Sequence, residues 1–161
     1  MSDDIDPRVA GLVATLRRNV DVIAKNTAGI KQADSLHTVA EGGSTLSWVI
    51  GHVVSSRDGM LKMLDSETAW DESLDERYRR GSTVPTGTEV DDLRELLLGL
   101  DRSQELLEAA LPRATAAQLA EPSGRPNASK LERIEFLTWH DSYHTGQTAV
   151  YRRLAGLAGA L

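Results

Sequence analysis

The sequence predicts an all-α protein, a four-helix bundle with a long crossover between the second and third helices. Apolar residues recur at helical spacing over four long segments, and no segment shows the alternation of polar and apolar residues that is typical of a β-strand. Aromatic residues make up only 4% of the 161 residues. The core must therefore consist mainly of Leu, Val, Ile and Ala, and we expect one domain spanning residues 1–161.

The first predicted helix covers residues 6–31. Asp6 can cap it, and Pro7 suits the first helical position. The second covers residues 45–64, and its apolar face includes Val49 and Val53. The continuous apolar face of the first helix consists of Val9, Val13, Leu16, Val20, Ile23, Thr27 and Ile30.

The third predicted helix covers residues 88–111 and stops at Pro112. The connection before it, residues 65–87, is longer than a turn between neighbouring antiparallel helices requires. This length indicates a crossover along the bundle.

The fourth predicted helix runs from Ser129 to Leu154. Ser129 and Glu132 form a capping-box pattern at its start. Residues 112–129 form the preceding loop, with room for one short turn. We expect this loop and the crossover to shape the mouth of any pocket.

Composition excludes several classes of function. The net charge is −6, the pI is about 5.2 and no run of basic residues exceeds two, so a nucleic-acid partner is not expected. The chain has no cysteine, which excludes disulfides and cysteine nucleophiles. The acidic start of the chain does not resemble a signal peptide, and no apolar run reaches the roughly 18 residues of a membrane span. We therefore expect a cytoplasmic protein with no membrane partner.

Two histidines lie one turn apart in the segment TWHDSYHTGQ, at His140 and His144. Residues four apart project from the same side of a helix, so both imidazoles can bind one metal ion. The residues between them are Asp, Ser and Tyr, so the glutamate of the HExxH proteases is missing. The pair alone is also compatible with polar surface residues.

A third histidine, His52, lies on the apolar side of the second predicted helix. Taken alone it suits a core histidine bonded to a backbone carbonyl. If the second and fourth helices are neighbours, His52, His140 and His144 converge, and a cation would compensate their burial. His37 lies in a polar loop and is expected at the surface.

Several neighbours of these histidines are candidates for lesser roles. Arg133 and Gln147 can orient a polar substrate, although Arg133 also suits a solvated position and Gln147 a hydrogen bond to a metal ligand or between helices. Tyr151 can donate to a substrate or belong to the core. Trp48 and Trp139 are expected to be packing residues.

The segments WVIGHVVSSRDGML and WHDSYHTGQ resemble the signatures of the second and fourth helices in the DinB/YfiT-like superfamily. The resemblance implies an up-down-down-up bundle, a homodimer, and a divalent metal, commonly zinc or nickel, held by three histidines. These map onto His52, His140 and His144. Characterised relatives include transferases and isomerases that use low-molecular-weight thiols such as bacillithiol and mycothiol.

Three ligands leave an open position on the metal, as in catalytic sites, and no fourth ligand is evident in the sequence. We therefore expect an enzyme that activates a low-molecular-weight thiol or water for attack on a small electrophile. Three alternatives are also compatible with the sequence. The protein can be a metal-dependent hydrolase, a metal-dependent binding or stress-response protein without turnover, or a protein whose metal serves folding and dimer assembly.

Overall fold

A computed structural model describes residues 6–161, and it is all-helical over this range. Between Asp6 and Leu161 the only β-type pairings are two isolated bridges, Thr38 with Thr45 and Pro122 with Ser129. The predicted all-α class is confirmed. The acidic start of the chain, on which the signal-peptide prediction depends, lies largely outside the described residues.

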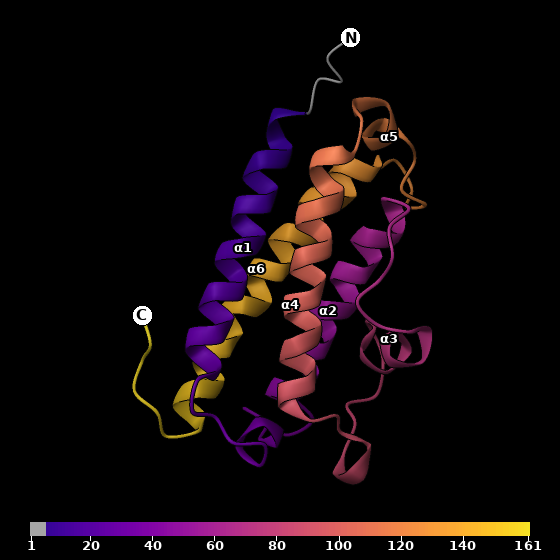
Figure 1. Cartoon of the computed structure of the whole chain (residues 1–161). Coiled ribbons are helices and arrows are strands. Elements are labelled where there is room, and N and C mark those ends of the chain that lie inside the picture. The colour runs from indigo at the N-terminus through magenta and orange to yellow at the C-terminus, as the bar shows by residue number, and fades with distance from the viewer. Residues whose placement is uncertain (1–5) are drawn as a thin grey trace.

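Six α-helices and three short 3₁₀ turns make up the described part of the chain (Figure 1). The 3₁₀ turns cover Asp34–Leu36, Gly87–Glu89 and Leu111–Arg113. The helices are α1 (Pro7–Thr27), α2 (Leu46–Met63), α3 (Glu72–Tyr78), α4 (Leu93–Ala110), α5 (Ala116–Ala120) and α6 (Lys130–Leu154).

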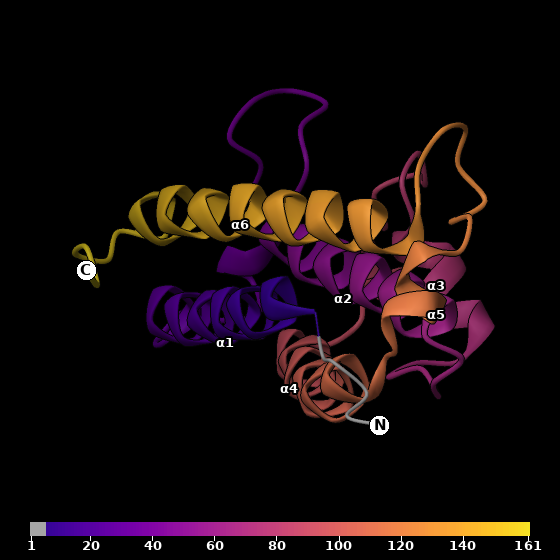
Figure 2. The same ribbon diagram turned by 90° about the horizontal axis from the view of Figure 1, so that it is seen from above.

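The four long helices α1, α2, α4 and α6 lie side by side. Helix α6 packs against α1 and α2, and α4 packs against the same two helices. Viewed from above, α6 and α4 therefore lie on opposite sides of α1 and α2 (Figure 2). Along the chain, α1 and α6 run down the page in Figure 1, and α2 and α4 run up.

The ends of the helices follow local sequence signals, with two corrections to the prediction. Helix α1 ends at Thr27 and not at residue 31, because Gly29 adopts a φ of +82°, a left-handed conformation that stops a helix. Helix α4 begins at Leu93 and not at residue 88, because the side chain of Asp92 caps it and residues 87–89 form a separate 3₁₀ turn.

The fourth predicted helix is confirmed. Ser129 and Glu132 form the predicted capping box, in which each side chain accepts a hydrogen bond from the other residue's backbone N–H. Helix α6 then continues for 25 residues, so one rigid element spans the molecule and carries two of the three candidate histidines.

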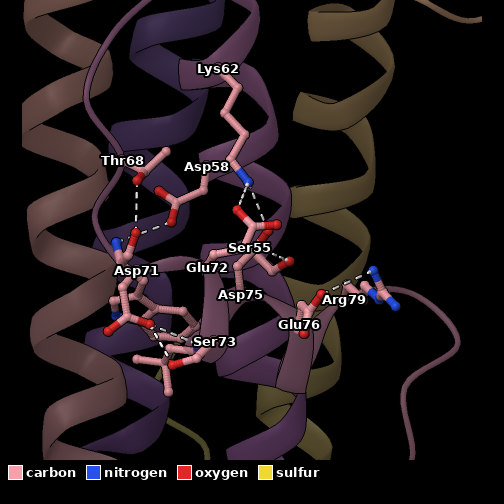
Figure 3. Close-up of polar contacts among 12 residues, drawn as sticks. Ser55, Asp58, Lys62, Thr68, Asp71, Glu72, Ser73, Asp75, Glu76 and Arg79 are labelled. Atoms are coloured by element: carbon pink, nitrogen blue, oxygen red, sulfur yellow. Dashed lines mark hydrogen bonds and ion pairs between the residues drawn. The ribbon is translucent and has the colours of Figure 1, made fainter.

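The sequence did not predict α3 within residues 65–87. This short helix is fastened to α2 by polar contacts, including those of Ser55 and Lys62 with Asp75 (Figure 3). Asp58 of α2 accepts hydrogen bonds from the backbone N–H groups of Ala69 and Trp70. The crossover is thus a folded segment that returns along α2.

The core consists of two apolar clusters with a polar layer between them. Each long helix contributes one residue to this layer: Asn19, Arg57, Gln104 and Asp141. The Arg57 and Asp141 side chains are fully buried, and Arg57 Nε lies 2.7 Å from Asp141 Oδ2. The sequence analysis did not identify this ion pair.

No helix within residues 6–161 is both long enough and apolar enough to cross a membrane. The cytoplasmic location and the assignment of residues 1–161 to one domain stay predictions.

Candidate metal centre

The structure brings the three predicted histidines together. His52 comes from α2, and His140 and His144 come from α6. One nitrogen from each ring can be chosen so that all three lie within 4.8 Å of one another. The Nε2 atom of His140 lies 3.3 Å from that of His52 and 3.0 Å from that of His144.

The orientation of His52 is fixed on both sides of its ring. Its Nδ1 lies 2.8 Å from the backbone carbonyl oxygen of Tyr78, the last residue of α3. A carbonyl only accepts, so Nδ1 carries the proton and the Nε2 lone pair faces the other histidines. Trp48, one turn earlier, stacks on the ring with centroids 4.6 Å apart.

Gly51 explains how Tyr78 comes close enough to α2 to hold His52. A Cβ atom at Gly51 would overlap the aromatic ring of Tyr78. The absence of a side chain therefore lets α3 pack directly on α2. The glycine next to His52 thus contributes to the geometry of the centre through Tyr78.

His144 is oriented by its own helix. Its Nδ1 lies 2.7 Å from Oε1 of Gln147, three residues further along α6. The amide oxygen accepts the Nδ1 proton, which leaves the Nε2 lone pair of His144 facing the cluster. Of the roles considered for Gln147, the structure supports the hydrogen bond to a candidate ligand.

His140 faces both other histidines with the same nitrogen, Nε2, and its hydrogen bonding is incomplete. Its Nδ1 is buried and has no partner among residues 6–161. If its proton is on Nε2, it can make a full hydrogen bond to only one of the two facing lone pairs. If the proton is on Nδ1, three lone pairs converge with no proton between them. In both cases the three histidines cannot satisfy one another's hydrogen-bonding capacity.

The surroundings favour the neutral form of all three imidazoles. Burial lowers the pKa of His52 and of His144. The pKa of His140 falls to about 4, first because of burial and then because of the neighbouring His144 and His52. A neutral imidazole is the form that binds a metal ion.

The donor set fits a divalent cation. A tetrahedral zinc ion with Zn–N bonds of about 2.0–2.1 Å separates its ligand nitrogens by about 3.3 Å, close to the two Nε2 separations of His140. Asp141, next in sequence to His140, points away from the cluster and pairs with Arg57. No Asp, Glu or Cys from the described part of the chain joins the three histidines.

A cavity of about 390 Å³ opens onto the histidines. Arg80 and Arg125 line it together with Arg133, and they come from the two connections that were expected to shape the pocket mouth. Sequence analysis identified Arg133 alone, because nothing in the sequence places the other two near α6. A larger depression of about 810 Å³ follows residues 76–89, but it contains no histidine.

The remaining candidates divide between core and surface. Tyr151 is buried and donates to the carbonyl of Ser44 at 2.7 Å, so it is a core residue. Trp48 packs on His52 as expected, but the prediction for Trp139 was wrong. Trp139 is 61% exposed, because it lies on the outer face of α6. His37 is exposed, as predicted.

The fold and the site thus define an all-helical protein with a three-histidine centre between two of its long helices. A family model described as DinB superfamily matches residues 15–148, and the chain belongs to this superfamily.

No curated protein matches the sequence. Among solved structures, the chain is similar to the crystal structure of a conserved protein from Enterococcus faecalis, with a TM-score of 0.68. The match has 19% sequence identity and covers 89% of this chain and 94% of the other. At this identity the likeness supports the fold alone.

Proposed function

We propose that the protein binds one divalent metal ion through His52, His140 and His144, and that zinc or nickel occupies the site. The observation that supports this most strongly is the orientation of the rings. Tyr78 and Gln147 hold the Nδ1 protons of two histidines, so that their Nε2 lone pairs face Nε2 of the third. Neutral histidines with a fixed tautomer are the usual form of metal ligands.

We interpret the four long helices as an up-down-down-up bundle in which residues 65–87 form the crossover. This topology supports the metal proposal in one respect. The crossover carries α3 back along α2, and α3 ends with the carbonyl that orients His52.

We propose further that the protein is an enzyme, a transferase that uses a low-molecular-weight thiol. A divalent ion with an open position lowers the pKa of a bound water or thiol and polarises an electrophile. The cavity reaches the histidines, so a small molecule has access to that position. The chain has no cysteine, so the thiol must be a cosubstrate.

In the proposed transfer, the thiol gives its proton to solvent and its sulfur forms a bond to the carbon of the electrophile. The bond between that carbon and the leaving group breaks, and the leaving group departs with the bonding electrons. The protein holds the three histidines in place, and the wall of the cavity contacts the electrophile.

The metal and the reaction are tested separately. Elemental analysis of the untagged protein is expected to give one metal ion per chain. The metal-loaded protein is then incubated with bacillithiol or mycothiol and 1-chloro-2,4-dinitrobenzene. Product that requires thiol supports the transferase. Release of 4-nitrophenol from its acetate ester without thiol supports the hydrolase alternative.

A binding or stress-response protein without turnover is the other alternative. It would retain the metal and bind small ligands in the cavity, but show neither reaction. A purely structural metal would instead be inaccessible, and adding a thiol would leave the visible spectrum of the cobalt-substituted protein unchanged. The cavity beside the histidines disfavours this last interpretation.

We also propose that the protein forms a homodimer through the outer face of α6. Five large side chains on this face are each 45–61% exposed, and they follow one another at helical spacing: Phe136, Trp139, Tyr143, Val150 and Leu154. Exposed apolar stripes of this kind are typical of interfaces.

A second copy of the chain is the occupant that fits the stripe. Phe136 and Leu154, and likewise Trp139 and Val150, are arranged symmetrically about the middle of the stripe. In an antiparallel dimer with two-fold symmetry, the start of the stripe on one copy therefore lies against the end of the stripe on the other. On one flank this arrangement places Glu135 of one copy near Arg153 of the other, which are opposite in charge.

Sedimentation velocity tests this proposal. The wild type is expected to sediment as a dimer at micromolar concentration, and Trp139→Glu as a monomer. Val39 is an exposed apolar residue outside α6, so Val39→Glu is the matched control. This variant should stay dimeric. A monomeric wild type, or a Trp139→Glu variant that remains dimeric, would contradict it.

A further inference from the structure

Three arginines surround the cavity beside the histidine centre. Arg80 follows α3, Arg125 lies in the loop before α6, and Arg133 lies in the first turns of α6. The folded chain thus brings together basic side chains from three separate segments. The lining of this cavity contains no acidic residue.

Within residues 6–161, this chain gives none of the three arginines an acidic partner. It has 24 acidic and 18 basic residues, and six other arginines form ion pairs, among them Arg57 and Arg77. Arg80, Arg125 and Arg133 form none within residues 6–161, although acidic residues outnumber basic ones.

Arg133 is close enough to the other two arginines to respond to their charges. The pKa of Arg133 is lowered, first by burial and then by the charges of Arg125 and Arg80. The Arg133 guanidinium packs over the ring of Phe136, 4.9 Å from its centroid, which limits its freedom to turn away. Like charges held close together without a counter-charge favour an anionic ligand.

We propose that this cavity binds a small dianion, with Arg80, Arg125 and Arg133 as its anion-binding residues. The inference rests on the proposed function, because it assigns the charge of the substrate or cosubstrate that reaches the histidine centre. Guanidinium groups bind carboxylates and phosphates through paired N–H donors, so the ligand is a dicarboxylate or a phosphate monoester.

The cavity also limits the size and shape of the ligand. Its volume of about 390 Å³ is near the lower end for small-molecule sites. Phe136 and Leu137 supply an apolar part of the wall, and Ser56 supplies a hydroxyl group. A short carbon chain with anionic groups matches this lining. The three histidines line the same cavity as the arginines, so a ligand bound by the arginines lies near the histidine centre.

Isothermal titration calorimetry tests the proposal on the metal-loaded protein and again after chelation. The probes are succinate and glycerol 3-phosphate, with acetate and neutral succinamide for comparison. Both dianions are expected to bind more tightly than acetate, and succinamide not to bind. A preference for succinate identifies the dicarboxylate class, and a preference for glycerol 3-phosphate the phosphate class. Higher salt should weaken binding, because the groups are partly exposed to solvent.

The variants Arg80→Gln, Arg125→Gln and Arg133→Gln are each expected to weaken dianion binding about tenfold, and the triple variant to abolish it. Arg18→Gln, an exposed residue of α1, removes the same charge elsewhere and should leave affinity unchanged. If the triple variant does not fold, the single variants and the salt titration decide the outcome.

Equal affinity for dianions and succinamide, or wild-type affinity in the arginine variants, would overturn the proposal. Failure of the metal proposal looks different. His144→Ala is expected to lose the metal and keep the three arginines, so dianion binding to its cavity would still be measurable. The arginine variants should keep the metal, which elemental analysis checks.

Discussion

Two polar centres lie side by side in the interior of the protein, and they differ in how completely they are satisfied. The first is the Arg57–Asp141 pair, and the second is the cluster of His52, His140 and His144. Both connect α2 with α6, and Asp141 directly follows His140 in the sequence.

The Arg57–Asp141 pair is saturated by protein groups. Arg57 donates two hydrogen bonds to Asp141, one to Gln104 and one to the carbonyl of Leu16, while Asn19 donates to Asp141 at 2.7 Å. All four long helices therefore meet at this pair. Nothing further is needed to compensate its burial.

The histidine cluster is not saturated. It contains one of the two buried side-chain polar atoms without a partner in the described residues, Nδ1 of His140, and its three Nε2 atoms face one another. Most buried polar groups that support a fold are hydrogen-bonded by their neighbours. The difference between the two centres supports the proposal that the histidines, and not the ion pair, bind a ligand.

The largest effect is expected from breaking the saturated centre. Asp141→Asn leaves the buried charge of Arg57 without a counter-ion and should lower the free energy of unfolding by about 3–5 kcal/mol. Urea denaturation measures this loss. The double variant Arg57→Met/Asp141→Leu removes both charges and should recover most of the stability. A single variant as stable as the wild type would contradict the structural role of the pair.

The variant Gly51→Ala tests whether the packing of α3 on α2 affects the histidine centre. The added methyl group meets the ring of Tyr78, so we expect a loss of about 1–3 kcal/mol and weaker metal binding, because the carbonyl of Tyr78 holds His52.

Gly59→Ala is the matched control on the same helix. Its methyl group would meet nothing within 4 Å, so this variant should gain about 0.5–1 kcal/mol, since alanine favours a helix over glycine. If both variants behave alike in thermal melts and metal titrations, the proposed contribution of Gly51 is wrong.

Gln147→Ala tests the hydrogen bond that orients His144. Removing such a partner of a metal ligand typically weakens metal affinity about 10- to 100-fold. Competition with a chromophoric chelator measures this change. Gln118→Ala, on α5 and outside the centre, serves as the control and should keep the wild-type affinity.

The smallest effect concerns pH in the metal-free protein. The pKa of His140 is about 6.5 in an unfolded chain but about 4 in the fold. Between these values the unfolded chain binds more protons, so stability rises with pH across the window and falls on acidification from pH 7 to pH 5. His140→Gln should lose less stability over this range.

Asp58 acts in the opposite direction and has to be separated from this effect. Burial raises its pKa from 3.8 to about 6, so below pH 6 the folded state takes up a proton before the unfolded chain does and is stabilised by acidification. The readout is therefore the difference between wild type and His140→Gln. Identical pH profiles for the two proteins would contradict the lowered pKa of His140.

The sequence predicted those features that depend on local patterns. The helical periodicity identified the four long helices, and the capping pattern at Ser129 and Glu132 located the start of α6. The spacing of His140 and His144, with His52 on an apolar face, identified all three members of the cluster. These signals lie within single helices, where position along the chain determines direction in space.

Features that depend on contacts between distant segments were missed. In the sequence, Arg57 and Asp141 look like ordinary polar residues. They become a buried ion pair only because α2 packs against α6. Helix α3 depends on polar contacts with α2, and Arg80 and Arg125 reach the cavity from irregular segments. No periodic pattern exists in such segments for sequence analysis to detect.

The most direct test of the central claim is the metal content of the untagged protein, measured by elemental mass spectrometry for the wild type, His144→Ala and His37→Ala. We predict close to one divalent ion per chain in the wild type and in His37→Ala, whose histidine is exposed and outside the cluster, and almost none in His144→Ala. Equal metal content in all three proteins, or no metal in the wild type after incubation with zinc or nickel, would contradict the assignment of His52, His140 and His144 as a metal centre.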